Sequence, residues 1–106
     1  MQNDTPAGLR VAPALDIDAV RAFALVAELQ SFTRAAQATA TTQSAVSLKL
    51  KRLEARLAAR LVERTPRLVR LTAEGAAFLD RARELLAAHD RALSIEQAPE
   101  RRLSLG

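Results

Sequence analysis

The stretch SFTRAAQATATTQSAVSLKLKRLEARL, residues 31–57, decides the fold, because it predicts a short helix, a polar break and a longer basic helix. Alanines at positions 35, 36 and 38 favour the short helix, and we expect Thr33 to cap its N-terminus. Residues 40–42 form the break, since adjacent threonines lose side-chain freedom in a helix and favour caps. We expect Thr42 to cap the second helix, over residues 43–57.

The predicted helix over residues 43–57 has two chemically different faces. One is an apolar stripe at helical spacing, made of Val46, Leu50, Leu53 and Leu57. The opposite face has Ser44, Ser47, Leu48 and Lys51, with Lys49, Arg52 and Arg56 beside it. Small hydroxyls with a cationic margin suit a helix whose N-terminal half enters a DNA major groove. A solvated face of an ordinary amphipathic helix is the alternative, but the short helix and tight turn before it favour DNA.

The basic residues gather in the middle of the chain. Residues 31–71 hold nine lysines and arginines against two glutamates, a charge of +7, so the remainder of this +4 chain is −3. A basic centre with acidic flanks is the electrostatic pattern of a nucleic-acid-binding face. An anionic membrane surface would also attract such a charge, but aromatic anchors are missing from the basic helix, so no membrane partner is expected.

Composition argues against an enzyme. The chain of 106 residues suits one domain, and it has no cysteine, tyrosine or tryptophan and a single histidine, His89. A convergent catalytic site or a metal site is therefore not expected, nor is a cofactor, and His89 has no second histidine at helical spacing. An apolar run of about 18 residues and a signal-peptide pattern are both missing, which predicts a cytoplasmic protein.

Four motifs resemble one known family: SFTRAA at residues 31–36, QSAVS at 43–47, KRLE at 51–54 and LVERTPRLVRLTAEG at 61–75. Together they are similar to the N-terminal domain of LysR-type transcriptional regulators, over residues 15–93. The family often has glycine at Ala58 and arginine at Leu48, so the departures are local. The resemblance implies a mainly α fold: a winged helix-turn-helix of three helices and a short β-hairpin wing, followed by a long linker and dimerisation helix.

The chain divides into four expected segments. Residues 1–14 should form a flexible arm and residues 15–72 the winged helix-turn-helix. Residues 73–96 should form the linker helix, and residues 97–106 a hinge towards a missing effector-binding domain, so we expect a piece of a longer regulator. The first helix should begin after Asp16 or Asp18 and run to about Gln30. Its inward stripe is predicted to be Val20, Phe23, Ala24 and Ala27.

Residues 61–71 predict the wing, a β-hairpin that turns at Pro66. The resemblance implies that Arg64 and Arg67 lie at the minor groove, and Arg70 projects from the same hairpin. A solvated hairpin without a partner is the alternative.

The last helix should begin after Thr72 and run to about Ile95, with Gly75 allowing close approach to the first helix. Apolar residues and His89 recur in steps of three and four along it, as in a coiled-coil seam: Leu79, Ala82, Leu86, His89 and Leu93. The resemblance implies that this helix pairs with its copy in a homodimer.

The expected partner is a double-stranded DNA operator, bound by the helix over residues 43–57 in the major groove and by the wing at the minor groove. The residues expected to face base edges are Gln43, Ser44, Ser47 and Leu48. Those expected at phosphates or at the rim of the groove are Thr33, Arg34, Thr42, Lys49, Lys51 and Arg52. A small-molecule effector is expected only in the missing domain. Two other classes stay open: a protein-interaction module built on the long helix and, disfavoured by composition, a small hydrolase or transferase.

Overall fold

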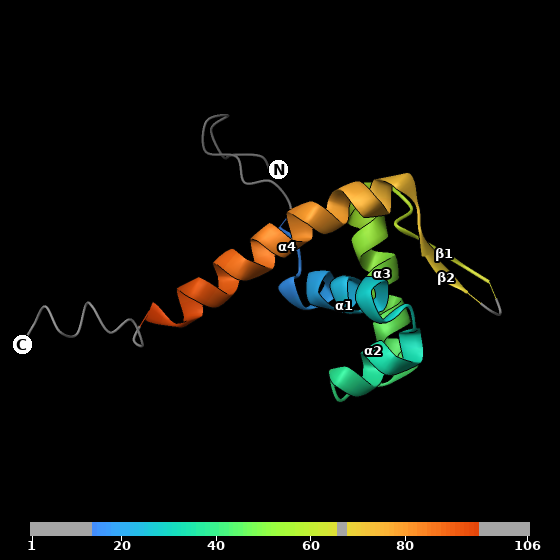
Figure 1. The fold of residues 1–106 in the computed structure, drawn as a ribbon, viewed down its shortest axis with the longest axis horizontal. Helices are drawn as coiled ribbons and strands as arrows, with labels where there is room; N and C mark the ends of the chain where they lie inside the picture. The colour runs from blue at the N-terminus through green and yellow to red at the C-terminus, as the bar shows by residue number, and fades with distance from the viewer. Residues whose placement is uncertain (1–13, 66–67, 96–106) are drawn as a thin grey trace, which may run out of the picture.

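A computed structural model of the chain describes residues 14–65 and 68–95. It contains four helices and a two-stranded antiparallel hairpin, which confirms the winged helix-turn-helix fold predicted from the sequence (Figure 1). The elements are α1 (Ile17–Leu29), α2 (Phe32–Ala38), α3 (Gln43–Leu57), β1 (Val62–Arg64), β2 (Val69–Leu71) and α4 (Ala73–Leu93). The expected arm, the turn at Pro66, the candidate site residue Arg67 and the expected hinge lie outside the described residues.

Side-chain caps fix where the helices begin. Asp16 caps α1 and Thr42 caps α3, where its Oγ1 accepts a hydrogen bond from the Ala45 amide at 3.0 Å. The prediction that Thr33 caps α2 was wrong, because Ser31 does so: its Oγ accepts from the Arg34 amide at 3.0 Å. The helix begins earlier than expected because Phe32, its first residue, is buried in the core.

The turn between α2 and α3 is stabilised by backbone hydrogen bonds to the last turn of α2. The amide of Thr39 donates to the carbonyl of Ala35 at 3.2 Å, and that of Thr41 donates to the carbonyl of Ala36 at 2.9 Å. Ala40 has a φ of 55°, a left-handed conformation that ends a helix but is unfavourable for a residue with a Cβ. The polar break predicted at residues 40–42 is thus a tight turn of defined geometry.

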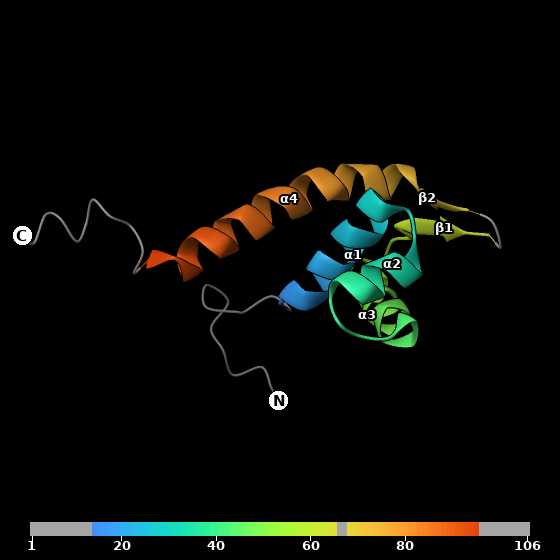
Figure 2. The same ribbon diagram turned by 60° about the horizontal axis from the view of Figure 1, so that its bottom comes forward.

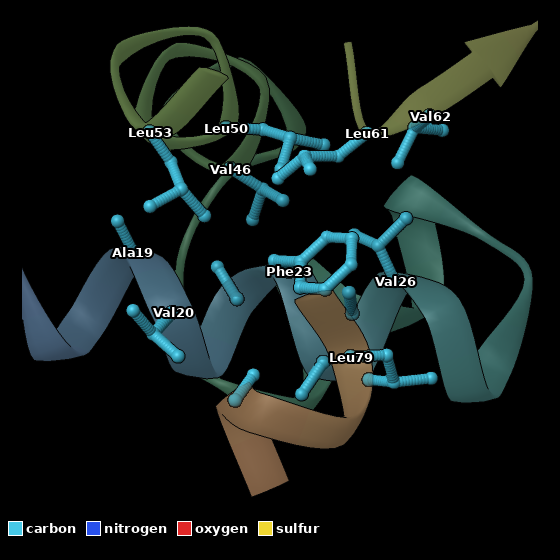
Figure 3. Packing of buried hydrophobic residues seen from close by; sticks show 14 of the residues in the cluster. Ala19, Val20, Phe23, Val26, Val46, Leu50, Leu53, Leu61, Val62 and Leu79 are labelled. Carbon is cyan, nitrogen blue, oxygen red and sulfur yellow. The ribbon is translucent and has the colours of Figure 1, made fainter. Parts of the chain in front are cut away.

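The core forms where α1 lies between α3 and α4 (Figure 2). Phe23 of α1 is completely buried, between Val46 and Leu50 of α3 on one side and Leu79 of α4 on the other (Figure 3). Its ring centroid is 5.6 Å from that of Phe78. Val20, Phe23 and Ala24 are buried as predicted, and Ala27, at the edge of the stripe, is half-buried.

Leu61 lies where α3, the wing and α4 meet. Its amide donates to Glu54 Oε2 of α3 at 2.8 Å, and its carbonyl accepts from the Thr72 amide at 3.0 Å. A Cβ added at Gly75 would overlap this same carbonyl oxygen. Gly75 therefore allows close approach as predicted, but its neighbour is the start of the wing and not the first helix.

Helix α4 packs on α1, and its C-terminal end extends past it (Figures 1 and 2). Leu79, Ala82 and Leu86 are 9%, 0% and 9% exposed within the single chain, because α1 covers that face. These three side chains were expected in the dimer seam, but they belong to the core of a single chain. Of the other two, His89 is half-buried and Leu93 is 70% exposed. The helix ends at Leu93, two residues before the predicted end.

Candidate nucleic-acid interface

The outer face of α3 is the side of the helix that α1 does not cover. The buried stripe of Val46, Leu50 and Leu53 fixes the rotation of the helix, and Leu57 is partly buried beside it. On the outer face Gln43, Ser44 and Leu48 are exposed and Ser47 is half-buried, as their positions in the sequence predict. Together with Lys51 and with Arg64 of β1, these four residues line an open hollow. The structure therefore brings the predicted base-facing residues to one surface.

Arg64 connects the wing to α3. Its guanidinium carbon lies 3.8 Å from the centroid of the Phe32 ring, and its Nη1 donates to Ser47 Oγ at 3.1 Å. A cation over an aromatic face is attracted by the ring quadrupole, so Arg64 has a preferred position against the body of the domain. Two predicted DNA-binding residues, Arg64 and Ser47, thus contact each other.

Gln43 and Thr33 form a second contact between predicted DNA-binding residues. The Thr33 hydroxyl donates to Gln43 Oε1 at 3.2 Å, which links α2 to the first residue of α3. Because the amide oxygen already accepts this bond, the Gln43 amide nitrogen is left to donate outward. Thr33, which does not cap α2, instead orients a side chain on the outer face of α3.

Cationic side chains predicted to bind DNA surround the outer face of α3. Arg34 of α2, Lys51 and Arg52 of α3 and Arg70 of β2 are exposed, and Lys49 is half-buried. Within residues 14–65 and 68–95 none of these five side chains, nor that of Arg64, forms an ion pair. Their charges are not neutralised by neighbouring carboxylates, so they are available to an anionic ligand.

One carboxylate does lie on the inner margin of this region. Glu54 Oε2 accepts hydrogen bonds from the amides of Leu61 and Val62 at 2.8 and 3.3 Å, so this carboxylate positions the first strand of the wing. From the sequence Glu54 counted only as a charge, and neither its contact with the wing nor the position of Phe32 beneath Arg64 was predicted. Leu61 lies beyond the end of α3 at Leu57, so helical periodicity could not have revealed the contact.

The ion pairs of the described residues lie on the other side of the domain, between α1 and α4. Arg21 Nη2 is 3.1 Å from Asp90 Oδ1, and Arg83 Nη2 is 3.6 Å from Glu28 Oε2. His89 Nδ1 lies 3.6 Å from the same Asp90 oxygen. The hydrogen bond from Arg21, aided by charge attraction, lowers the pKa of the Asp90 carboxyl below its usual value.

Other kinds of site find no support in the described residues. Across residues 14–65 and 68–95, His, Asp and Glu do not form a group of three that could hold a metal ion. In the same residues, no helix has the length and apolar character to cross a membrane.

Comparison with known proteins identifies a family and a set of related structures. The profile of the bacterial regulatory helix-turn-helix proteins of the lysR family matches residues 17–76. The transcriptional regulator DgdR of Burkholderia cepacia is 41% identical over 81 residues, which cover 76% of this chain and 28% of DgdR. The chain spans about a quarter of the length of the first relatives that it matches.

Two solved structures are DNA complexes of separate DNA-binding domains. The BenM_DBD complex with benA site 1 DNA is 34% identical, with a TM-score of 0.73 over 86% of this chain and 98% of the BenM chain. The CbnR_DBD–DNA complex is 32% identical, with a TM-score of 0.73 over 80% of this chain and 98% of that one. The fold of this chain is therefore similar to that of domains crystallised on DNA.

Proposed function

We propose that this chain, which belongs to the lysR family of bacterial regulatory helix-turn-helix proteins, binds double-stranded DNA sequence-specifically as part of a transcriptional regulator. Its named relatives are transcriptional regulators and not enzymes. The main support is the outer face of α3, where small polar side chains are exposed and the surrounding cations lack carboxylate partners. The two related domains crystallised with DNA give independent support.

In this proposal α3 enters the major groove, which is about 12 Å wide and admits one helix. Gln43, Ser44, Ser47 and Leu48 would then face base edges, because Ser44, Ser47 and Leu48 lie opposite the buried stripe and Gln43 is exposed at the start of the helix. Phosphate and rim contacts are assigned to the residues around them: Thr33, Arg34, Thr42, Lys49, Lys51 and Arg52.

The wing is assigned to the flanking minor groove through Arg64, Arg67 and Arg70. The short distance from Arg64 to Ser47 supports an arrangement in which wing and α3 bind neighbouring parts of one site. Arg64 then has two roles, since its contacts with Phe32 and Ser47 also orient the wing. We assign the protein to the cytoplasm, because the DNA partner of a bacterial regulator lies there. A small-molecule effector is assigned to a further domain of the regulator.

Site selection from random duplexes, followed by titration of the selected DNA, tests the function. We expect one enriched motif and binding that weakens strongly as salt concentration rises. A chain that shifts no duplex at low salt would contradict DNA binding and favour a protein-interaction module built on α4.

We further propose that the domain forms a homodimer through α4, by a face next to the one first expected. Phe78, Leu85 and Ala92 recur every seven residues along this face, with Ala88 between them. Phe78 and Leu85 are only partly buried at the edge of the core, and Ala88 and Ala92 are exposed. An apolar face at heptad spacing, on a helix that extends past its own domain, suits an antiparallel copy of itself.

Ala88→Arg tests the dimer without disturbing the core, because Ala88 is exposed and arginine is a good helix former. We expect this variant to sediment as a monomer, since each chain would bring an arginine charge into the apolar interface. Ala87→Arg is the matched control, because Ala87 is also exposed but lies about 100° away around the helix. Equal sedimentation of the two variants would contradict this face. Leu86→Arg is unsuitable because Leu86 lies in the core.

A further inference from the structure

Leu48 is a large apolar side chain on a polar face. Val46, Leu50 and Leu53, the other large apolar residues near it on α3, are buried, whereas Leu48 is 47% exposed. It lines the hollow formed by Gln43, Ser44, Ser47, Lys51 and Arg64, and each of those neighbours has a hydrogen-bond donor at its tip.

Folding does not account for this leucine. Leu48 lies on the opposite side of α3 from the stripe that packs on α1, so it adds nothing to the core. The buried stripe also prevents the helix from rotating to cover it. A polar residue at this position would be compatible with the same fold, so an explanation lies in what the outer face of α3 contacts.

The chemistry of a leucine restricts that contact. It has no donor or acceptor and forms no hydrogen bond with a base edge. The major groove offers one protruding apolar group, the C5-methyl of thymine, and 5-methylcytosine carries a methyl on the same ring atom. Removing either methyl leaves the hydrogen-bonding edge of the base unchanged.

We propose that Leu48 is a specificity-determining residue that contacts the C5-methyl of a pyrimidine in each half-site, an inference that rests on the proposed DNA-binding function. Ser44 precedes Leu48 by four residues and therefore lies one turn before it on the same side of α3. Ser47, adjacent in sequence, accepts a hydrogen bond from Arg64 and keeps its own hydroxyl hydrogen for a DNA acceptor. Polar contacts from Ser44 and Ser47 would therefore surround the methyl contact and fix the position of Leu48 along the DNA.

Changing only the DNA provides the sharpest test, because the protein stays intact. The site obtained by selection is synthesised with each thymine in turn replaced by uracil, which lacks the methyl group. In parallel, each cytosine is replaced by 5-methylcytosine, so that the two sources of a methyl group are distinguished. Dissociation constants are measured at fixed salt for the wild type, Leu48→Ala and Leu68→Ala. Leu68 is a matched control, because this leucine of the wing is 46% exposed.

We expect one pyrimidine per half-site at which the wild type binds the methylated base about three- to fivefold more tightly, the value of one buried methyl group. Leu48→Ala should bind both forms equally, whereas Leu68→Ala should retain the difference at that position. Leu48→Arg should shift the selected base there towards guanine, whose O6 and N7 accept from arginine.

Two results would overturn the inference while leaving the proposed function intact. One is a selected site at which no methyl group, present or added, changes binding. The other is a methyl effect that persists in Leu48→Ala, because another side chain would then make the contact. Failure to select any site, with no salt-dependent binding, would overturn the proposed function and this inference with it. Matching thermal melts of Leu48→Ala and wild type establish that the variant is folded.

Discussion

Arginine and lysine serve different purposes on the two sides of this domain. Between α1 and α4, Arg21 and Arg83 each lie within 4 Å of a carboxylate, on Asp90 and Glu28. Around α3 and the wing, cations such as Lys51 and Arg52 lack such partners in the described part of the chain. The same residue types therefore contribute to packing on one side and remain available to a ligand on the other, a difference that net charge does not reveal.

Paired and unpaired cations contribute differently to protein stability and to DNA binding. An exposed ion pair contributes little to stability, but it neutralises its own field locally. Unpaired cations on one face add their potentials together, and each phosphate that they neutralise releases counterions. The two sides should therefore respond differently to salt and to substitution.

Salt should weaken DNA binding strongly, because the proposed interface brings several unpaired cations to phosphates. With six phosphate contacts, affinity should fall by about a thousandfold between about 50 and 200 mM salt. Lys51→Gln should make the log–log slope shallower by about one, whereas Arg83→Gln should leave it unchanged because Arg83 faces α1. Fluorescence anisotropy across a salt series measures both. Equal slopes for the two variants would remove the distinction between paired and unpaired cations.

Gly75→Ala should destabilise the junction at which the two sides meet. Alanine is the better helix former by about 1 kcal/mol, but its methyl group would overlap the Leu61 carbonyl oxygen. Overpacking of this kind costs about 1–3 kcal/mol, so urea unfolding should show a net loss of stability. Ala76→Gly, at the exposed neighbouring position, should lose only the helix-propensity term. A stabilised Gly75→Ala would mean that α4 begins further from the wing.

Glu54→Ala should also destabilise the domain, because it removes the acceptor for two amides at the start of the wing. Hydrogen bonds to a charged group contribute about 1.5–3 kcal/mol, and solvent access to Glu54 places the expected loss near the lower end. Glu63→Ala removes an exposed carboxylate of β1 and should have little effect on urea unfolding. If both variants unfold alike, Glu54 acts only as a surface charge.

Asp90→Asn should have the smallest effect, a slight fall in melting temperature at neutral pH. The pKa of Asp90 is lowered in the folded chain, chiefly by the hydrogen bond from Arg21, so its ionised form contributes stability above the usual pKa of 3.8. This contribution disappears as pH falls through the lower folded-state pKa. The melting temperatures of wild type and variant should therefore converge in acid, and DNA binding at neutral pH should be the same for both.

Local patterns in the sequence predicted the elements well. The bounds of α3, the break before it and the caps Thr42 and Thr72 all depend on interactions between residues close in sequence, which propensity and capping rules describe. The residues of the outer face of α3 followed from the same periodicity. Ser31 was missed because two neighbouring hydroxyl residues could each cap α2, and the burial of Phe32 decides between them.

Contacts between distant residues could not be predicted in this way. A stripe of apolar residues on α4 indicated a covered face, but not that α1 would be the element covering Leu79, Ala82 and Leu86. The Glu54–Leu61 and Arg64–Phe32 contacts likewise depend on how the wing packs on α3 and α2. Sequence spacing therefore identified the residues of the candidate interface, and the structure identified which of them position the others.

The bond from the Thr72 amide to the Leu61 carbonyl joins the two ends of the wing, so the hairpin is a closed loop whose base is independent of its tip. A loop closed in this way accommodates insertions or deletions at the tip without moving the helices on either side. An engineer could likewise exchange the hairpin between Leu61 and Thr72 as a cassette, to change the proposed minor-groove contacts while retaining α3 and α4.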